Sequence, residues 1–151
     1  MRIGLTFIMF LAAHTWLGNL ARPQSSDLVG QWKVEITLEN RSPRSLRFVA
    51  EESGVGSLSL EPRDNWEEPG KPKQAKWTIG AAKRVTFSGP VEFPIGNVGR
   101  EPGILVFKGA FESESKITGE IALFPMDQDP SDPKATPSKT GKFKATRISA
   151  P

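Results

Sequence analysis

Alternation of apolar and polar side chains at every second residue is the feature that most constrains how this chain folds. Over residues 31–38, Trp32, Val34, Ile36 and Leu38 would share one face of a strand, with polar side chains on the other. The same period recurs in eight segments: 31–38, 46–51, 57–60, 75–79, 84–93, 105–111, 116–123 and 142–146. After the apolar N-terminal run, no segment of useful length has a helical period. The sequence therefore predicts an all-β protein.

Turn residues separate most of these strands, which favours an antiparallel arrangement. Eight antiparallel strands can close a single up-and-down barrel, and closure removes the open sheet edges. A β-sandwich is the alternative, because it is built from strands of similar length. Inward-facing Gly89, Gly109 and Gly119 would relieve crowding where strands bend. We expect one barrel domain over residues 30–149, preceded by a short N-terminal extension at 22–29.

The first residues resemble an export signal. Arg2 precedes an apolar run that extends to Leu20, and this order is typical of a signal peptide over residues 1–21, cleaved after Ala21. An uncleaved N-terminal anchor is the alternative, because the run is about long enough to span a bilayer. Export without cysteines favours a bacterial envelope or exterior. The sequence thus predicts a secreted or periplasmic protein with no membrane span after leader cleavage.

The residue types present exclude most enzyme mechanisms. The chain has no cysteine and no tyrosine, and its single histidine, His14, lies in the leader. A thiol nucleophile, a histidine base and the usual transition-metal ligands are therefore missing from the mature part. We expect no enzymatic activity and no cofactor. The 20 basic and 17 acidic side chains nearly balance, which disfavours nucleic acid as a partner. An unidentified protein or a small apolar ligand is expected instead.

The start of the first strand resembles a known barrel signature. Gly30-Gln31-Trp32 is similar to the Gly-x-Trp start of calycin barrels, which include lipocalins and avidins. In that group the tryptophan closes one end of the barrel, and in lipocalins a basic residue near the last strand packs across it. The resemblance implies a calycin-like barrel in which Arg147 fills that place. The second lipocalin motif, a turn of the Thr-Asp-Tyr type, is absent.

The same segment is also similar to the small-barrel metalloprotease inhibitors of Gram-negative bacteria. Those proteins have a Leu-x-Gly-Gln-Trp start, which Leu28 to Trp32 matches, and an N-terminal trunk that enters the protease active site. The resemblance implies that residues 22–27 act as a trunk. The chain departs from that family in lacking its disulfide and in having a short trunk.

Three tryptophans and one arginine are the candidate ligand-binding residues: Trp32, Trp66, Trp77 and Arg147. Bulky inward residues predict a solid interior, with room for at most a shallow apolar pocket near one mouth of the barrel. Trp66 lies in a polar, proline-rich loop over residues 61–73. It is interpreted either as a lid folded back on the barrel or as an anchor for a partner.

The second long loop, residues 125–140, is acidic. Asp127, Asp129 and Asp132 have the spacing of calcium ligands, but Asp132 stands where such a loop needs glycine. We interpret the segment as a solvated acidic loop, with calcium as the minor alternative.

One strand is apolar on both faces, because Ile104 and Val106 alternate with inward residues. This predicts a covered or self-associating surface. Taken together, the patterns predict an exported, non-enzymatic binding or envelope-associated module that makes its contacts through its loops. The alternatives are a metalloprotease inhibitor and a carrier of a small apolar ligand.

Overall fold

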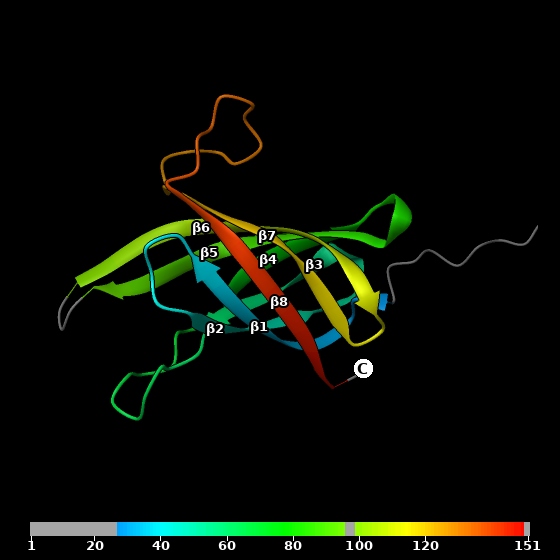
Figure 1. Ribbon diagram of the computed structural model, residues 1–151, viewed down its shortest axis with the longest axis horizontal. Helices are drawn as coiled ribbons and strands as arrows, with labels where there is room; N and C mark the ends of the chain where they lie inside the picture. The colour runs from blue at the N-terminus through cyan, green and yellow to red at the C-terminus, as the bar shows by residue number, and fades with distance from the viewer. Residues whose placement is uncertain (1–26, 96–98, 150–151) are drawn as a thin grey trace, which may run out of the picture.

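Eight antiparallel strands close into one barrel in the computed structural model, which describes residues 27–95 and 99–149 (Figure 1). The strands are β1 (Gly30–Leu38), β2 (Arg44–Ala50), β3 (Val55–Leu60), β4 (Lys73–Ile79), β5 (Arg84–Ile95), β6 (Gly99–Ser113), β7 (Lys116–Phe124) and β8 (Lys139–Ser149). Each strand pairs with the next along the chain, and β8 returns to pair with β1. This order confirms the predicted up-and-down barrel and shows that the β-sandwich alternative is wrong.

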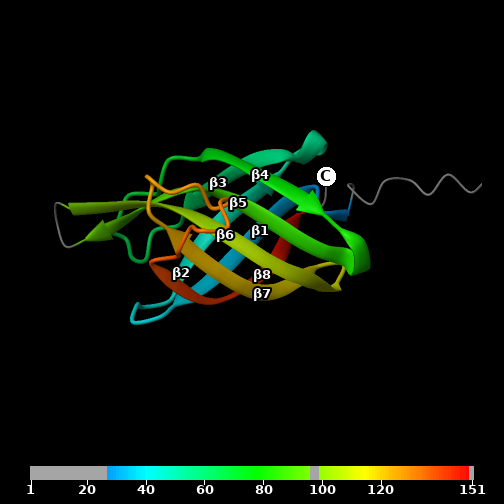
Figure 2. The same cartoon turned by 90° about the horizontal axis from the view of Figure 1, so that it is seen from above.

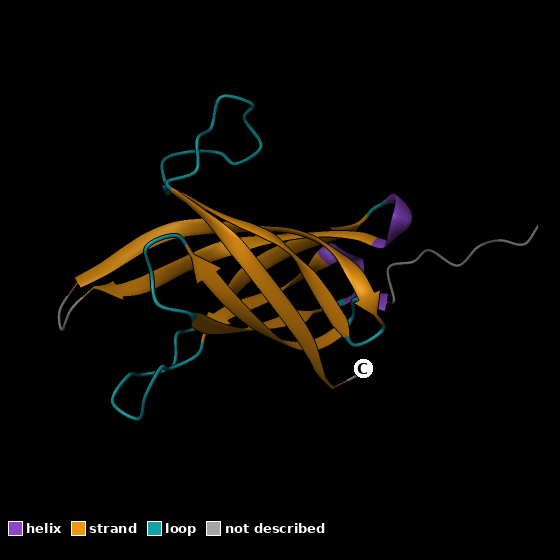
Figure 3. Ribbon diagram, in the orientation of Figure 1, coloured by secondary structure: helices purple, strands orange, loops and turns teal. Residues whose placement is uncertain are grey.

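The connections divide between the two ends of the barrel, as Figure 2 shows. At the short-turn end, β2 joins β3 and β4 joins β5 through the 3-10 turns η2 (Glu52–Gly54) and η3 (Ala81–Lys83). This end also holds the beginning of β1 and the end of β8 (Figure 3). At the opposite end, which we call the long-loop end, lie the connections 39–43, 61–72 and 125–138, together with the paired ends of β5 and β6 at Ile95 and Gly99. All the long connections are therefore at one end.

The β5–β6 hairpin is longer than the sequence predicts, because β6 begins at Gly99 and not at residue 105. Residues 90–95 of β5 pair with residues 99–104 of β6. In the described residues, β5 pairs with β4 only as far as Ser88, and β6 pairs with β7 only from Ile104 onward. Each arm of the extension therefore has one side without a neighbouring strand, where proline is tolerated. The part of this extension that lies outside the predicted strands, residues 94–95 and 99–104, contains Pro94 and Pro102.

Four phenylalanine rings fill the middle of the barrel. Phe87 stacks between Phe48 and Phe107, with ring centroids 4.4 Å and 4.1 Å apart and planes within 12°. Phe143 meets Phe87 and Phe107 edge-on, at 5.6 Å and 5.2 Å. β2, β5, β6 and β8 thus contribute one ring each to a common cluster. The middle of the barrel is packed with side chains, as the bulky inward residues predicted.

Two glycines make room for this cluster. Gly109 of β6 and Gly119 of β7 lie directly opposite one another, and Phe143 of β8 pairs with Gly119. A Cβ atom on Gly109 would come within 2.8 Å of Cζ of Phe143. The predicted role of these glycines in relieving crowding is therefore confirmed.

The N-terminal predictions fall mostly outside the described residues. The leader, residues 1–21, and residues 22–26 of the extension belong to that part of the chain. Between 27 and 95 and between 99 and 149, no helix is both long and apolar enough to cross a bilayer. Residues 27–29, expected in the extension, pack against the barrel, and Leu28 is fully buried.

Candidate functional site

Trp32 closes the short-turn end of the barrel. Its side chain is fully buried, and its ring meets Phe111 edge-on, with centroids 6.0 Å apart. The indole Nε1 donates a hydrogen bond of 2.8 Å to the carbonyl oxygen of Leu28, which satisfies its polar atom. Trp32 is therefore part of the structure of this end and is not exposed to a ligand.

Arg147 packs across Trp32, at the place that the calycin resemblance implies. Its guanidinium carbon lies 4.3 Å from the centroid of the Trp32 ring. Nη1 donates to the carbonyl of Val29 at 2.7 Å, Nε donates to the carbonyl of Glu114 at 3.1 Å, and Nη2 donates to the carbonyl of Asp27. Burial lowers the pKa of Arg147, and the nearby Asp27 and Glu114 carboxylates oppose that change. Through these backbone oxygens the arginine joins β8 to two other segments, residues 27–29 and the turn between β6 and β7.

Replacing Arg147 with lysine tests this closure. Lysine keeps the charge but loses the planar fork that reaches several carbonyls at once. We expect the free energy of unfolding to fall by about 1.5–3 kcal/mol, the range for hydrogen bonds to charged groups. Urea unfolding followed by circular dichroism measures it. Arg84→Lys, at an exposed position, is the control, and equal midpoints for the two variants would contradict the assigned role.

Trp77 also has a structural position. It is buried, and its Nε1 donates to the carbonyls of Glu51 and Val55, at 3.0 Å and 2.7 Å. These bonds fasten β4 to the chain on both sides of η2. Trp32, Trp77 and Arg147, three of the four candidate ligand-binding residues, thus make their polar contacts within the barrel itself.

Arg44 is the inward-facing charge at the long-loop end. It is the first residue of β2 and shares its face with Leu46 and Phe48, so its side chain points into the mouth of the barrel and is only 8% exposed. Its Nη2 donates to Oε1 of Glu67 at 2.6 Å and to the carbonyl of Glu61 at 3.2 Å. Its Nε is buried and has no hydrogen-bond partner.

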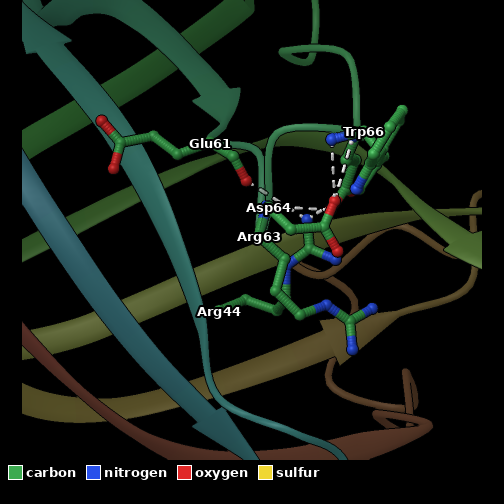
Figure 4. Close-up of polar contacts among 6 residues, drawn as sticks. Arg44, Glu61, Arg63, Asp64 and Trp66 are labelled. Carbon is green, nitrogen blue, oxygen red and sulfur yellow. Dashed lines mark hydrogen bonds and ion pairs between the residues drawn. The ribbon is translucent and has the colours of Figure 1, made fainter.

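The loop that carries Glu67 is held by hydrogen bonds along its length (Figure 4). Oδ1 of Asp64 accepts the backbone N–H of Trp66 at 3.0 Å and that of Glu67 at 3.2 Å. Oε2 of Glu67 accepts the backbone N–H of Arg63 at 2.9 Å. At the base of the loop, Gly70 N–H donates to the carbonyl of Leu60 at 2.8 Å. The loop therefore has a defined shape.

Trp66 projects from this loop into solvent, with 93% of its surface exposed. The interpretation of Trp66 as a lid over the barrel is therefore wrong, because a lid would bury the ring. The loop folds back through Glu67, whose side chain is 15% exposed. The polar residue of this turn reaches the barrel while the aromatic residue faces away from it.

Glu67 is charged at neutral pH. Burial raises its pKa, but hydrogen bonds from the Arg63 backbone and the Arg44 side chain, with the positive charges of both arginines, outweigh burial. The net pKa lies below the ordinary value of a glutamate. The Arg44–Glu67 contact is consequently an ion pair.

A half-open pocket of about 110 Å³ lies beside Arg44 at the mouth of the barrel. The residues of its apolar floor and basic rim come from β1, β2, β5 and the two connections 39–43 and 61–72: Ile36, Leu38, Phe93, Arg41, Arg44 and Arg63. Arg41 forms an ion pair with Glu101 of β6, and its guanidinium carbon is 5.3 Å from the centroid of the Phe93 ring. Sequence reasoning missed this cluster, because Arg63 and Phe93 are far from Arg41 and Arg44 in the chain.

The acidic loop does not gather its carboxylates. Oδ1 of Asp129 accepts the N–H and the hydroxyl of Ser131, at 2.8 Å and 2.7 Å, which lowers the pKa of Asp129. Asp132 accepts the N–H of Lys134 at 2.9 Å. In the described part of the chain, no three acidic or histidine side chains are placed to hold a metal ion. Asp127, Asp129 and Asp132 therefore do not form the calcium site considered above.

The acidic loop lies beside the apolar outer face of the barrel. Val106 and Phe124 are half-buried there and line a groove together with Pro130 and Pro137 of the loop. The loop is fastened where it meets β8, because Ser138 N–H donates to the carbonyl of Leu123 at 2.7 Å. The outer apolar strip is thus partly covered by the chain's own loop.

No protein-family model matches the chain, and no curated protein does. Among solved structures, the chain is similar to a redesigned β-barrel at 13% sequence identity. That similarity covers 83% of this chain and 94% of the other, with a TM-score of 0.45.

Proposed function

We propose that this chain is an exported, non-enzymatic binding module, and that Trp66 anchors a protein partner at the long-loop end. The observation that carries the proposal is the 93% exposure of a tryptophan on an ordered loop. Tryptophan is among the residue types most enriched at the energetic centres of protein interfaces. A ring of this size in water is otherwise unfavourable, and burying it against a partner recovers the hydrophobic free energy.

The order of the loop supports the same proposal. Binding costs less when the contact residue is already held in its bound position. The carboxylate of Asp64 accepts the backbone N–H of Trp66 itself. The residue that follows Trp66, Glu67, is bound to the barrel by Arg44. Two further large apolar side chains are exposed at this end, Ile95 at 52% and Met126 at 51%.

The packed interior favours a surface contact over an enclosed ligand. The four stacked and edge-on phenylalanine rings occupy the place where an eight-stranded barrel would hold a carried molecule. The packing of Arg147 across the Trp32 ring supports a calycin-like arrangement of the short-turn end. The inhibitor alternative depends on a trunk whose residues 22–26 lie outside the described ranges, so it has no support beyond the sequence.

Replacing Trp66 with alanine is the test of this function. The full chain, immobilised, is used to isolate partners from the extracellular fluid of its own host, and the affinity of each identified partner is then measured by surface plasmon resonance. Loss of an anchor at the centre of an interface costs at least about 2 kcal/mol, so Trp66→Ala should weaken binding roughly 30-fold or more. The free energy of unfolding should stay within about 0.5 kcal/mol of the wild type, because the ring packs on nothing.

Trp66→Phe and Lys83→Ala complete the design. The phenylalanine variant should bind with intermediate affinity. Lys83, exposed at the short-turn end, should leave the affinity unchanged. If Trp66→Ala binds every identified partner as tightly as the wild type, or if Lys83→Ala weakens binding equally, the proposed contact surface is wrong.

A further inference from the structure

A half-open groove of about 550 Å³ lies on the outside of the barrel, between the acidic loop and the outer faces of β6, β7 and β8. The loop rises from the ends of β7 and β8 in Figure 1, and in Figure 2, seen from above, it lies over the wall of the barrel. The volume is within the range of roughly 300–1,000 Å³ that small-molecule sites occupy. The phenylalanine rings fill the interior, so this outer groove offers a ligand the space that the interior lacks.

The floor of the groove is apolar, and the loop supplies a second apolar wall. Val106 of β6 and Ala122 of β7 lie directly opposite one another on the outer face, and Phe124 follows two residues further along β7. All three are half-buried, so part of each side chain remains open to the groove. Pro130 and Pro137 line the groove from the side of the loop. Apolar surface is therefore offered from two sides, as is typical of small-molecule sites.

The loop that forms the second wall is held in shape by its own hydrogen bonds. Gln128 connects its two arms, because its N–H donates to the carbonyl of Pro125 at 3.2 Å and its Oε1 accepts the N–H of Thr136 at 3.0 Å. At the end of the loop, the N–H and the hydroxyl of Ser138 both donate to the carbonyl of Leu123, at 2.7 Å and 3.0 Å. A groove whose walls are already in place binds a ligand at a lower entropic cost.

The polar end of the groove carries two positive and two negative side chains. Lys108, Glu120 and Lys142 lie side by side on β6, β7 and β8, and Glu39 accepts a hydrogen bond of 3.0 Å from the hydroxyl of Thr140. None of the first three forms an ion pair with another residue in the ranges that the structure describes. The charges sum to zero, so the groove favours neither an anion nor a cation. Ammonium donors and carboxylate acceptors are both present, which suits a group that donates and accepts.

We propose that this groove binds a small, uncharged, mainly apolar molecule that carries one hydroxyl group. The apolar body lies between Phe124 on the sheet and the prolines of the loop, and the hydroxyl contacts Glu120 and a neighbouring lysine. A protein surface is a poorer occupant, because the loop stands over the floor and keeps a flat partner away from Val106 and Ala122. The site is separate from the Trp66 ring and does not rest on the protein partner proposed above.

The probe for this site is 2-naphthol, titrated into the full chain at pH 7 by isothermal calorimetry and by amide chemical shifts. We expect saturable binding, with the largest shifts at residues 104–108, 120–124 and 130–137. Ala122→Glu should weaken binding at least about tenfold, because it places a charge against the apolar body of the ligand. Ala110→Glu is the matched control, since Ala110 is exposed on the outer face of β6 beyond the groove, and it should bind normally.

A second pair of variants changes only the loop, so it tests the site without altering the barrel. Pro130→Ala removes part of the second wall and should weaken binding roughly fourfold, the effect of losing the burial of about one methylene group. Pro133→Ala, at an exposed position of the same loop that does not line the groove, should bind like the wild type. Trp66→Ala should also bind 2-naphthol normally, even if it loses its protein partner.

Three analogues test the chemistry of the ligand. Naphthalene lacks the hydroxyl, 2-naphthoate is an anion and 2-naphthylmethylammonium is a cation, and each should bind more weakly than 2-naphthol. The proposal is overturned if 2-naphthol does not saturate the wild type, if either matched pair of variants binds alike, or if any analogue binds as tightly as 2-naphthol. Loss of 2-naphthol binding in Trp66→Ala would also overturn it, because it would place the ligand on the exposed tryptophan.

Discussion

Replacing Phe87 with alanine is expected to lower the free energy of unfolding by about 3–5 kcal/mol, the range for large aromatic deletions in a core. Phe87 is the central ring of the stack and contacts Phe48, Phe107 and Phe143. The strands around it are hydrogen-bonded into a closed barrel, so they cannot collapse into the space that the ring leaves. Urea unfolding of the full chain, followed by circular dichroism, measures the loss.

Phe111→Ala is the matched control for this substitution. Phe111 is also an inward phenylalanine, but it lies half-buried near the short-turn end, where the loss of a ring leaves a space open to water. Its effect should be clearly smaller. If the two variants unfold at the same urea concentration, or if Phe87→Ala costs less than about 1 kcal/mol, the cluster is not the centre of the core.

Replacing Glu67 with glutamine is expected to cost about 2–3 kcal/mol. Removing one partner of a fully buried pair costs about 3–5 kcal/mol, and the 15% exposure of the Glu67 side chain reduces that value. The loss arises because Arg44 keeps its charge in a site that is 8% exposed. Urea unfolding at pH 7 measures it. Glu112→Gln is the control, since its ion pair with Lys116 is as short, at 2.5 Å, but both side chains are 45% exposed.

The pH dependence of the unfolding free energy is a second test of the Arg44–Glu67 ion pair. The pKa of Glu67 is lower in the folded protein than in the unfolded chain, so its contribution to stability is complete above the unfolded pKa. That contribution decreases as the pH falls through the folded pKa. The difference in unfolding free energy between the wild type and Glu67→Gln should therefore shrink on acidification. A difference that is independent of pH would show that the carboxylate charge is not responsible.

The barrel could be predicted from the sequence because inward and outward residues alternate so regularly. A one-residue shift of any strand would expose its apolar set, so the pattern also fixes which face is inside. The contact between Trp32 and Arg147 was predictable through a resemblance, although the carbonyl partners of Arg147 were not. The beginning of β6, residues 99–104, was missed, because a proline such as Pro102 argues against a strand unless one side is known to be open.

The basic rim could not be predicted from residue patterns alone. It depends on how β1, β2 and β5 are staggered and on the path of a proline-rich loop, and both are tertiary properties. One signal was nevertheless present in the sequence. Arg44 is in phase with Leu46 and Phe48, and a charge at the beginning of an inward-facing row needs a partner from elsewhere. Glu67 could not be identified as that partner, because loop conformation is not encoded in a simple period.

Arg147 and Arg44 hold the two ends of the barrel in different ways. Arg147 fixes the short-turn end through main-chain atoms, and Arg44 fixes the long-loop end through a side chain of a loop. Arg147 is bound by main-chain oxygens, which every amino-acid sequence supplies, so the base tolerates side-chain changes in the segments that it joins. Arg44 depends on a single carboxylate delivered by a connection between two strands. We therefore expect the connection between β3 and β4 to tolerate other lengths and sequences, provided that each returns one acidic side chain to Arg44.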